Sequence, residues 1–168
     1  MSHRQCKSKT KSPRNGAFVL CYNLGMKSGI KEKNKKSADF TIMKAEKGAG
    51  FGLKTKVPFK KGDLVIEYIG IKRENKDIEY HTGKYLFEID DKHTIDGSPR
   101  WNLARYINHS CRPNCEVEIS KEGKILIEAI KNIKEGEEIT YDYGKEYFNE
   151  FIKPIGCKCV KCINKKSK

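Results

Sequence analysis

The residues best suited to chemistry are densest at positions 105–115, which read Arg-Tyr-Ile-Asn-His-Ser-Cys-Arg-Pro-Asn-Cys. Apolar segments flank this run, and a chain of 168 residues seldom places Asn, His, Ser and Cys consecutively on a plain surface loop. Asn108 and His109 can each donate and accept hydrogen bonds, and the thiolate of Cys111 could ligate zinc. A turn capped by these side chains is the simpler alternative.

Three more cysteines close the chain, at Cys157, Cys159 and Cys162. Structural zinc takes four ligands in a tetrahedron, so this cluster is one ligand short. The total of seven cysteines is odd, and their spacing favours metal ligation in a reducing compartment over a disulfide framework. Unliganded tail cysteines are the alternative.

Two tyrosines flank an aspartate in the run Tyr141-Asp142-Tyr143-Gly144. The run follows a strand-like segment, and residues i and i+2 of a strand point to the same side. A lone strand tyrosine usually packs in the core. The functional interpretation of this pair therefore depends on the other motifs.

Closely spaced glycines at residues 48–52, Gly-Ala-Gly-Phe-Gly, predict a turn whose backbone can approach a ligand. Most such turns are only turns. The Gly-Lys-Ser/Thr of a phosphate loop is absent, so this turn would offer a ligand its backbone N–H and C=O groups.

Taken in order, these four motifs resemble those of the SET-domain protein-lysine N-methyltransferases with a post-SET zinc cluster. The resemblance covers roughly residues 39–162. It implies a mainly β fold, the SET fold, built of small twisted β-sheets with few short helices. Its C-terminal segment is threaded in a pseudoknot-like way, a rare exception to unthreaded topology. The implied cofactors are S-adenosyl-L-methionine, as methyl donor, and Zn²⁺.

The resemblance assigns the cofactor contacts to the glycine turn, a loop tyrosine and the Asn-His pair. The turn would lie against S-adenosylmethionine, and the Asn-His pair would hydrogen-bond its amino-acid end and its adenine. The implied cofactor-binding residues are Gly48, Ala49, Gly50, Phe51, Tyr80, Asn108 and His109.

The implied catalytic residues are tyrosines. Methyl transfer needs a narrow, mostly apolar channel and a neutral lysine amine, whose ordinary pKa is about 10.4; burial and the nearby sulfonium charge both favour the neutral form. By resemblance, Tyr143 is the catalytic tyrosine, with its hydroxyl close to the transferred methyl group. Tyr141 would restrict the product to mono- or dimethyl-lysine, and Tyr68 would hydrogen-bond the target amine. Tyr85 either lines the channel or only packs.

For the metal, the resemblance implies Cys111 as the fourth ligand beside Cys157, Cys159 and Cys162. The tail would thus be fastened beside the active site. Only two residues separate the last two cysteines, as in the MYND-containing branch of the family. Four residues are the commonest spacing in the family, so we expect a tighter closing loop. Cys115 is the competing fourth ligand and is otherwise expected to be a buried thiol.

The composition supports one modest domain with basic ends. The net charge is +13: residues 1–37 hold ten Lys or Arg and one Glu, residues 145–168 hold seven Lys and two Glu, and the middle is nearly neutral. We interpret residues 1–37 as a basic, largely flexible segment, 38–144 as a SET domain and 145–168 as a post-SET zinc-binding tail. The basic ends favour non-specific contact with nucleic acid or chromatin, although solubility alone explains them equally well.

No apolar run is long enough for a transmembrane helix, and the N-terminus lacks a signal segment, so no membrane association is expected. We expect an intracellular reducing compartment. That compartment is the nucleus or chromosome if the protein is eukaryotic or acts on a host, and otherwise the cytoplasm.

Short strand-like segments separated by turn residues predict the elements that position these motifs. Strands are expected at residues 40–44, 53–57, 64–70, 85–89, 93–95, 116–120, 124–130 and 138–141, with 116–120 and 124–130 forming a hairpin. Weak helical patterns cover residues 72–80, 101–107 and 145–152, the last stopped by Pro154. Arg105 is expected to pair with a carboxylate such as Glu67 or Asp142.

The predicted function is S-adenosylmethionine-dependent methylation of a protein lysine, with a histone tail as the leading substrate and mono- to dimethylation favoured. One alternative is the same chemistry on a non-histone protein, such as a ribosomal or DNA-packaging protein. The other is a basic chromatin- or nucleic-acid-binding module that has lost catalysis. That module would bind DNA in a salt-sensitive way and would bind no cofactor.

Overall fold

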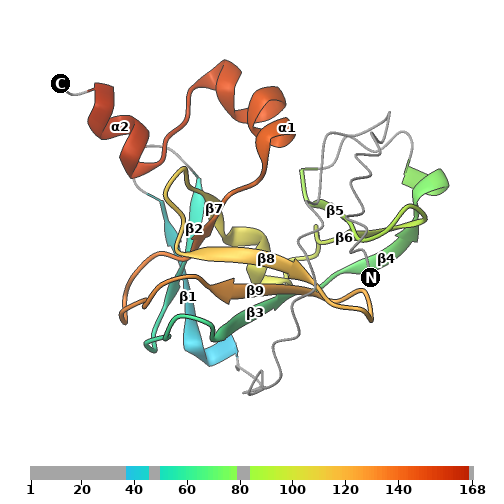
Figure 1. The fold of residues 1–168 in the computed structure, drawn as a ribbon, viewed down its shortest axis with the longest axis horizontal. Helices are drawn as coiled ribbons and strands as arrows, with labels where there is room; N and C mark the ends of the chain where they lie inside the picture. The colour runs from blue at the N-terminus through green and yellow to red at the C-terminus, as the bar shows by residue number, and fades with distance from the viewer. Residues whose placement is uncertain (1–36, 46–49, 79–83, 167–168) are drawn as a thin grey trace, which may run out of the picture.

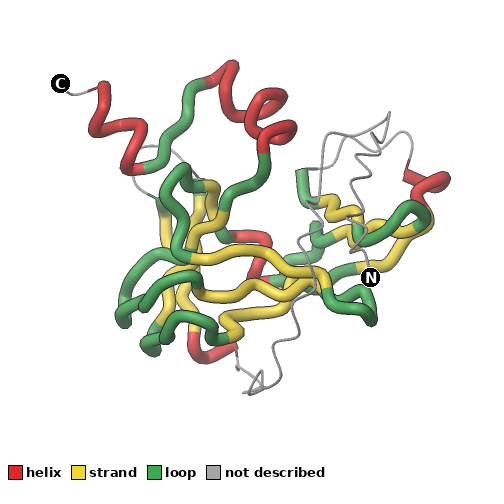
Figure 2. The backbone as a smooth tube through the Cα atoms, viewed as in Figure 1, coloured by secondary structure: helices red, strands yellow, loops and turns green. Residues whose placement is uncertain are grey.

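The computed structural model describes residues 37–45, 50–78 and 84–166, and its strands form four small sheets with short helices around them (Figures 1 and 2). Gly48, Ala49 and Tyr80 lie outside these residues, as does nearly all of the N-terminal segment 1–37. Within the described residues the fold is mainly β, as predicted. None of the described helices is long and apolar enough to cross a membrane.

A two-stranded sheet pairs β1 (Phe40–Lys44) with β2 (Phe51–Thr55) in antiparallel register, after a one-turn 3-10 helix, η1 (Ser37–Asp39). The first strand has its predicted bounds, whereas the second begins and ends two residues early. The Thr55 hydroxyl explains the end, because it accepts a hydrogen bond from the Val57 N–H at 3.1 Å and bends the chain.

The central sheet has three antiparallel strands in the order β3-β9-β8. They span Leu64–Tyr68 (β3), Ile125–Ala129 (β9) and Cys115–Ile119 (β8). The predicted hairpin is confirmed, since β8 pairs with β9 from Cys115 opposite Ala129 to Ile119 opposite Ile125. Four of the five β9 residues are buried, which marks this strand as the middle of the core.

The third sheet has the order β4-β6-β5 and corrects one prediction. Residues 72–80 are not helical throughout: β4 (Ile71–Glu74) is a strand, and only η3 (Asn75–Ile78) forms a 3-10 turn. β4 pairs with β6 (His93–Asp96), which pairs in turn with β5 (Leu86–Glu88). The Arg73 guanidinium donates to Asp96 Oδ2 across the pair at 3.2 Å. This strand pairing overrides a helical pattern with few apolar positions.

The fourth sheet is a parallel pair of two-residue strands, β7 (Asn108–His109) and β10 (Thr140–Tyr141). Hydrogen bonds from both ends of the loop 110–114 reach β10: Ser110 N–H donates to the Tyr141 carbonyl, and Asn114 N–H to the Thr140 carbonyl. The loop therefore encloses the late strand on two sides. This contact lies where the resemblance expects the C-terminal segment to be threaded.

The buried side chain of Asn114 strengthens this crossing. Its Nδ2 donates to the Glu138 carbonyl at 2.8 Å, and its Oδ1 accepts from the Thr140 N–H at 2.8 Å. Both backbone groups would otherwise lack a partner in a dry interior, where an unmet hydrogen bond costs about 1–3 kcal/mol. Asn114 therefore fixes the segment that leads into Tyr141 and Tyr143.

The remaining helices are short. A 3-10 helix, η4 (Leu103–Tyr106), lies inside the predicted range and leads into β7. After β10 come α1 (Lys145–Tyr147), a π-helical turn η5 (Phe148–Ile152), a 3-10 turn η6 (Lys153–Ile155) and α2 (Val160–Lys166). Pro154 does not stop the helical segment. It occupies the first turn of η6, where a missing N–H is tolerated, and Gly156 at φ 83° turns the chain next.

The core lies between the central sheet, β2 and η4. Its fully buried apolar side chains are Leu53, Phe59, Val65, Ile107, Ile125, Ile127, Ile133 and Ile139. Tyr68 and Tyr141 belong to the same cluster, and Tyr143 packs against it. The candidate catalytic residues therefore form part of the core, which holds them rigidly.

Candidate active site

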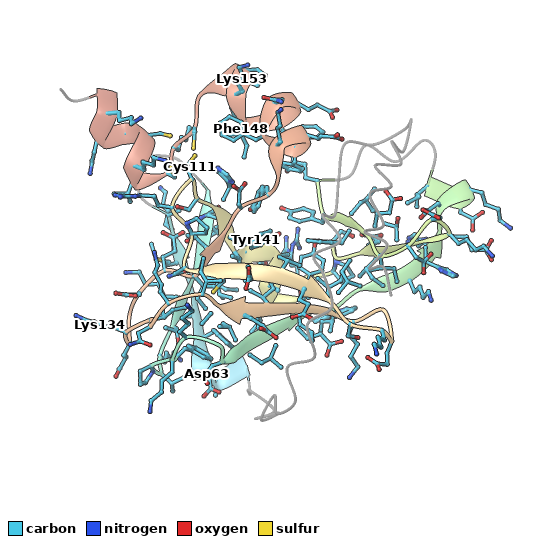
Figure 3. The ribbon with its side chains drawn as sticks, in the orientation of Figure 1. Asp63, Cys111, Lys134, Tyr141, Phe148 and Lys153 are labelled. Atoms are coloured by element: carbon cyan, nitrogen blue, oxygen red, sulfur yellow. The ribbon has the colours of Figure 1, made fainter. Side chains whose placement is uncertain are left out.

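A pocket of about 750 Å³ opens where the C-terminal segment meets the sheets. Tyr68, Tyr141 and Tyr143 line it together with Asn108 and Phe51, although these residues come from four separate parts of the chain. Figure 3 shows Tyr141 near the middle of the molecule, with Cys111 and Phe148 on the side of the C-terminal helices. The volume is within the range of small-molecule sites.

Tyr143 is held at both ends. Its hydroxyl donates to the Ile107 carbonyl at 2.6 Å, and its backbone N–H donates to His109 Nδ1 at 3.2 Å. Burial raises the pKa of the Tyr143 phenol well above its ordinary range. The Tyr141 ring lies 4.9 Å from the Tyr143 ring, and burial raises the pKa of Tyr141 in the same way. Both phenols are therefore neutral at ordinary pH.

Tyr68 closes another wall of the pocket. Its hydroxyl donates to the Tyr85 carbonyl at 2.9 Å, and burial raises the pKa of this phenol too. The ring lies so close to Gly97 that a Cβ there would approach the ring carbons to 2.2 Å. The Tyr68 ring thus needs a glycine opposite it. Tyr85 itself lines the pocket, which favours the lining role over plain packing.

Asn108 joins the glycine turn to the crossing strands. Its Nδ2 donates to the Phe51 carbonyl at 3.1 Å and to Glu138 Oε1 at 2.9 Å. Gly50 and Phe51 lie at the pocket beside it, and Gly50 adopts φ 81°, which favours glycine. The Phe51 side chain is 62% exposed and meets Tyr106 edge-on. The described half of the glycine turn therefore contributes to the pocket as expected.

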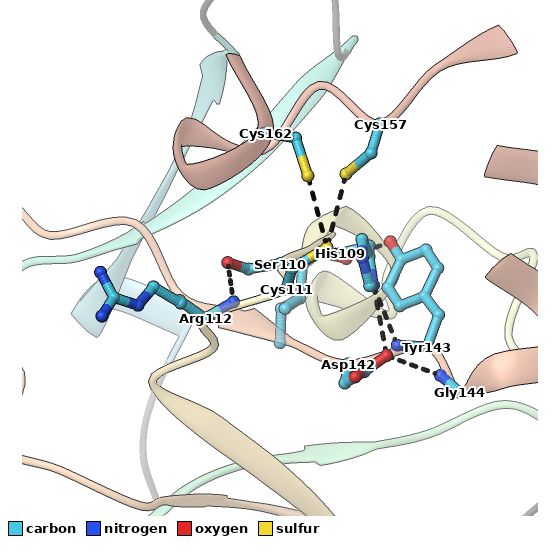
Figure 4. A network of polar contacts seen from close by, with 10 residues as sticks. His109, Ser110, Cys111, Arg112, Asp142, Tyr143, Gly144, Cys157 and Cys162 are labelled. Carbon is cyan, nitrogen blue, oxygen red and sulfur yellow. Dashed lines mark hydrogen bonds and ion pairs between the residues drawn. The ribbon is translucent and has the colours of Figure 1, made fainter. Parts of the chain in front are cut away.

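His109 connects Tyr143 to the cysteines (Figure 4). Because Nδ1 accepts from a backbone N–H, the proton of the neutral ring lies on Nε2, which is 3.4 Å from Cys111 Sγ. Burial lowers the pKa of His109, although Asp142 opposes this effect, so the neutral ring is favoured. The ring also packs against Phe148, with centroids 5.3 Å apart.

Four cysteine sulfurs gather beside the pocket. Those of Cys111, Cys157, Cys159 and Cys162 all lie within 4.8 Å of one another. Cys111 Sγ is 3.8 Å from Cys157 Sγ and 3.7 Å from Cys162 Sγ. Tetrahedral zinc with bonds of about 2.3 Å would hold its sulfurs about 3.8 Å apart, so the spacing fits this metal.

The competing ligand is excluded by position. Cys115 is fully buried in the apolar core, where burial raises the pKa of its thiol to about 12. It is not part of the four-sulfur group. Cys115 is the buried thiol that the sequence favoured.

Arg105 corrects another prediction, because it forms no ion pair with Glu67 or Asp142 among the described residues. Its guanidinium instead lies over the Tyr85 ring, 4.2 Å from the centroid, and its buried Nε has no hydrogen-bond partner within the described part of the chain. Arg105 therefore lines the pocket with an Nε that has no partner among the described residues. A buried donor without a partner is costly, so a ligand group that accepts a hydrogen bond there would be stabilising.

Sequence reasoning missed several residues of the site. Glu138 and Asn114 orient other side chains, and Phe87 and Tyr147 line the pocket. The aromatic pattern around residues 143–151 was a usable signal, because the Tyr143, Tyr147 and Phe151 rings follow one another at 5.0 and 4.7 Å. No sequence signal indicated the role of Glu138.

The SET-domain family model matches residues 50–144 of this chain, more than half of its length. The chain belongs to the SET-domain family. The match covers the pocket from Gly50 to Gly144, and the four-cysteine group beside it fits a post-SET zinc site.

Several curated SET-domain relatives are similar to this chain. Human histone-lysine N-methyltransferase 2D is 40% identical over 121 residues, covering 66% of this chain and 2% of the relative. Histone-lysine N-methyltransferase trithorax of Drosophila virilis is 40% identical over 124 residues, covering 67% and 3%. A histone-lysine N-methyltransferase of Chaetomium globosum, described as H3 lysine-4 specific, is 40% identical over 121 residues, covering 65% and 11%. The chain thus spans a small fraction of these relatives' length.

Proposed function

We propose that this SET domain transfers methyl groups from S-adenosylmethionine to the ε-amine of a protein lysine. The observation that carries the proposal is the convergence of Tyr68, Tyr141, Tyr143 and Asn108 on one pocket beside four clustered cysteines. The names of the similar proteins support the same reaction.

The residues around the pocket suit the proposed methyl donor. When bound, S-adenosylmethionine supplies an electrophilic methyl group on a sulfonium. Arg105 offers a guanidinium whose Nε has no partner among the described residues, and Asn108 an amide, to the charged groups of an amino-acid end. The backbone at Gly50 and Phe51, together with His109, completes the proposed binding residues; Gly48, Ala49 and Tyr80 are retained as proposals on the resemblance alone.

The tyrosines would keep the target amine neutral and aligned. A wall of buried rings disfavours an ammonium ion, so the amine loses its proton more readily there than in water. The cation of Arg105, which also lines the pocket, acts in the same direction. Tyr143, whose hydroxyl and backbone are both anchored, would align the reacting atoms, and the surrounding aromatic rings would help to exclude water.

Tyr68 and Tyr141 would control the space around the amine. Tyr141 is almost fully buried, so its hydroxyl occupies volume that added methyl groups would need. We propose mono- to dimethylation on this ground. Tyr68 would hydrogen-bond the amine after releasing or sharing its bond to the Tyr85 carbonyl.

The four cysteines would hold Zn²⁺ and fasten residues 145–168 to the domain formed by residues 38–144. Burial raises the pKa of the Cys111 thiol in the absence of a cation. A bound cation reverses that preference by stabilising the thiolates. Since Tyr147 of this tail lines the pocket and Phe148 packs against His109, metal binding would complete the pocket.

Histones are the proposed substrates because the similar proteins are named for histone lysines, one of them for H3 lysine 4. The test has two steps. Calorimetric titration with S-adenosylhomocysteine should give one site per chain. Incubation with S-adenosylmethionine should then methylate lysine in purified core histones, read by mass spectrometry.

A whole-cell lysate treated in parallel separates the alternatives. If a non-histone protein is methylated more strongly than the histones, that protein becomes the proposed substrate, and the proposed reaction is unchanged. Absence of both cofactor binding and labelling, combined with salt-sensitive DNA binding, would favour the module without catalysis.

A further inference from the structure

Among the described residues, the Glu138 carboxylate makes its hydrogen bond to the proposed site through Asn108. An amide nitrogen carries two N–H groups. Both are used here, one donating to Glu138 Oε1 at 2.9 Å and the other to the Phe51 carbonyl at 3.1 Å. Because both partners accept hydrogen bonds, the nitrogen and oxygen of this amide cannot be exchanged without losing both bonds.

The oxygen of the amide is consequently the atom left for a ligand. No hydrogen bond reaches Asn108 Oδ1 within the described residues, and Asn108 lines the pocket. A carbonyl oxygen accepts and never donates, so its complementary ligand group is an N–H or O–H donor. The only strong donor at the amino-acid end of the proposed methyl donor is its amino group.

We propose that Glu138 is a positioning residue that fixes Asn108 Oδ1 as the acceptor for the amino group of the methyl donor. This inference rests on the proposed function. Without the carboxylate, one amide N–H loses its partner, and the side chain is free to turn that N–H toward the pocket. A donor facing a cationic amine is repulsive, so binding weakens.

The backbone around Glu138 is fixed independently of its side chain. The Glu138 carbonyl accepts from Asn114 Nδ2, and the next residue, Ile139, donates its N–H to the Leu53 carbonyl at 2.8 Å. Lys54 and Glu138 form an isolated antiparallel bridge. Changing the carboxylate therefore leaves these backbone bonds in place, which makes substitution at this position a clean test.

Gly52 leaves room for the arrangement. A Cβ at Gly52 would lie 2.5 Å from Glu138 Oε1 and 3.1 Å from Asn108 Nδ2. A side chain at Gly52 would therefore have to displace the Glu138 carboxylate from its place beside Asn108. This packing predicts that the two positions are energetically coupled.

The test compares two ligands by calorimetry: S-adenosylhomocysteine and its deamino analogue, in which hydrogen replaces the amino group. Wild type should bind the deamino analogue about 10–100-fold more weakly, the range expected for one hydrogen bond to a charged group. Glu138→Ala should weaken binding of S-adenosylhomocysteine about tenfold and leave binding of the analogue unchanged. The difference in affinity between the two ligands should therefore become smaller.

Two matched variants separate the acceptor from its surroundings. Glu138→Gln keeps an acceptor oxygen and should remain within about threefold of wild type. Glu137→Ala removes the neighbouring carboxylate, which among the described residues accepts a hydrogen bond from the exposed Lys134 N–H alone. This change should alter the affinity for neither ligand. Gly52→Ala should weaken binding of S-adenosylhomocysteine when it is made in the wild-type protein. The same change should weaken binding much less when it is made in the Glu138→Ala variant.

Failure of the inference and failure of the proposed function give different results. No binding of S-adenosylhomocysteine by wild type would overturn the proposed function and the inference together. Equal binding of the two ligands by wild type would overturn the inference alone and needs no variant. The inference would also be overturned if Glu137→Ala reduced the affinity difference between the two ligands as much as Glu138→Ala does. The same holds if folded Glu138→Ala left that difference unchanged.

Discussion

The β-domain and the C-terminal tail meet at the pocket, but different forces hold them in place. The β-domain has a contiguous buried core and the Asn114 hydrogen bonds at the strand crossing. Between residues 145 and 165 no residue is buried, and Ile155 and Val160 are 74% and 72% exposed. The tail is positioned instead by ring contacts and by its three cysteine sulfurs, which lie beside the sulfur of Cys111.

This difference assigns separate tasks to the two regions. A wall built into the core keeps its geometry whether or not a ligand is bound, which suits alignment of reacting atoms. A segment with little buried apolar area is stable only when something else fastens it, and metal binding is then folding energy. We therefore expect chemistry to depend on the β-domain, and completion of the pocket to depend on the metal.

The largest effect is expected from Tyr143→Phe on the β-domain side of the pocket. Loss of the anchored hydroxyl should reduce methyl transfer about 10²–10³-fold, the usual cost of removing one preorganised polar group from an active site. Affinity for S-adenosylhomocysteine should stay within about twofold, because the ring remains. Rapid-quench methylation assays and calorimetry measure the two quantities.

Tyr147→Phe is the matched control on the tail side. Its hydroxyl makes no hydrogen bond among the described residues, and its ring contacts to Tyr143 and Phe151 survive the change. Transfer should fall less than about threefold. Equal losses of methyl-transfer rate in the two variants would contradict the view that the chemistry depends on the β-domain and not on the tail.

Asn114→Ala should destabilise the β-domain by about 2–4 kcal/mol, since it leaves the Glu138 carbonyl and the Thr140 N–H without partners. Urea denaturation followed by circular dichroism gives the free energy of unfolding. Asn132→Ala is the control, because Asn132 Oδ1 accepts only the exposed Lys61 N–H. Similar losses for both asparagines would show that the crossing is not specially stabilised.

Removing the metal should affect the tail selectively. Chelation, or Cys159→Ser, should increase amide hydrogen exchange across residues 145–166 while β9 stays protected, and transfer should fall about 10–100-fold. Exchange followed by mass spectrometry resolves the two regions. Unchanged exchange in the tail of the chelated protein would mean that the ring contacts alone suffice.

The pH dependence should reflect the substrate amine and not the tyrosines. Burial raises the pKa of Tyr68, Tyr141 and Tyr143, so these phenols stay protonated above the ordinary tyrosine value of about 10. The rate at low substrate should rise up to about tenfold per pH unit between pH 6 and 8, as the neutral amine accumulates. A descending limb below pH 9 in the stably folded protein would contradict this assignment.

The smallest rate effect is expected from Tyr141→Phe, which changes the product more than the speed. Removing a buried hydroxyl creates space, so di- and trimethyl-lysine should increase at the expense of monomethyl-lysine. Mass spectrometry of the substrate at completion gives the ratio. An unchanged ratio would show that the Tyr141 hydroxyl does not limit the number of methyl groups added.

The sequence was sufficient to predict those features that a specific motif encodes. Cys111 and the tail cysteines were placed together although 45 residues separate Cys111 from Cys157, because the family motif specifies the set. The β8–β9 hairpin followed from alternation and a glycine turn. These features depend on local residues or on a specific motif.

Features set by tertiary contacts were harder to predict. Residues 71–74 became a strand because β6 offers them a partner. Arg105 stacks on Tyr85 and, within the described part of the chain, forms no ion pair with Glu67 or Asp142. Glu138 carries no motif, so its bond to Asn108 becomes visible only when β2 and the crossing strands are brought together. Tyr80 lies outside the described residues and stays a prediction.

The most direct test of the account is intact-mass analysis of core histones incubated with S-adenosylmethionine and zinc-loaded protein. Wild type should add methyl groups to lysine, and Tyr143→Phe, shown by calorimetry to bind S-adenosylhomocysteine normally, should add almost none. Equal methylation by the two proteins, or none by a folded wild type that binds S-adenosylhomocysteine and zinc, would contradict catalysis at this pocket.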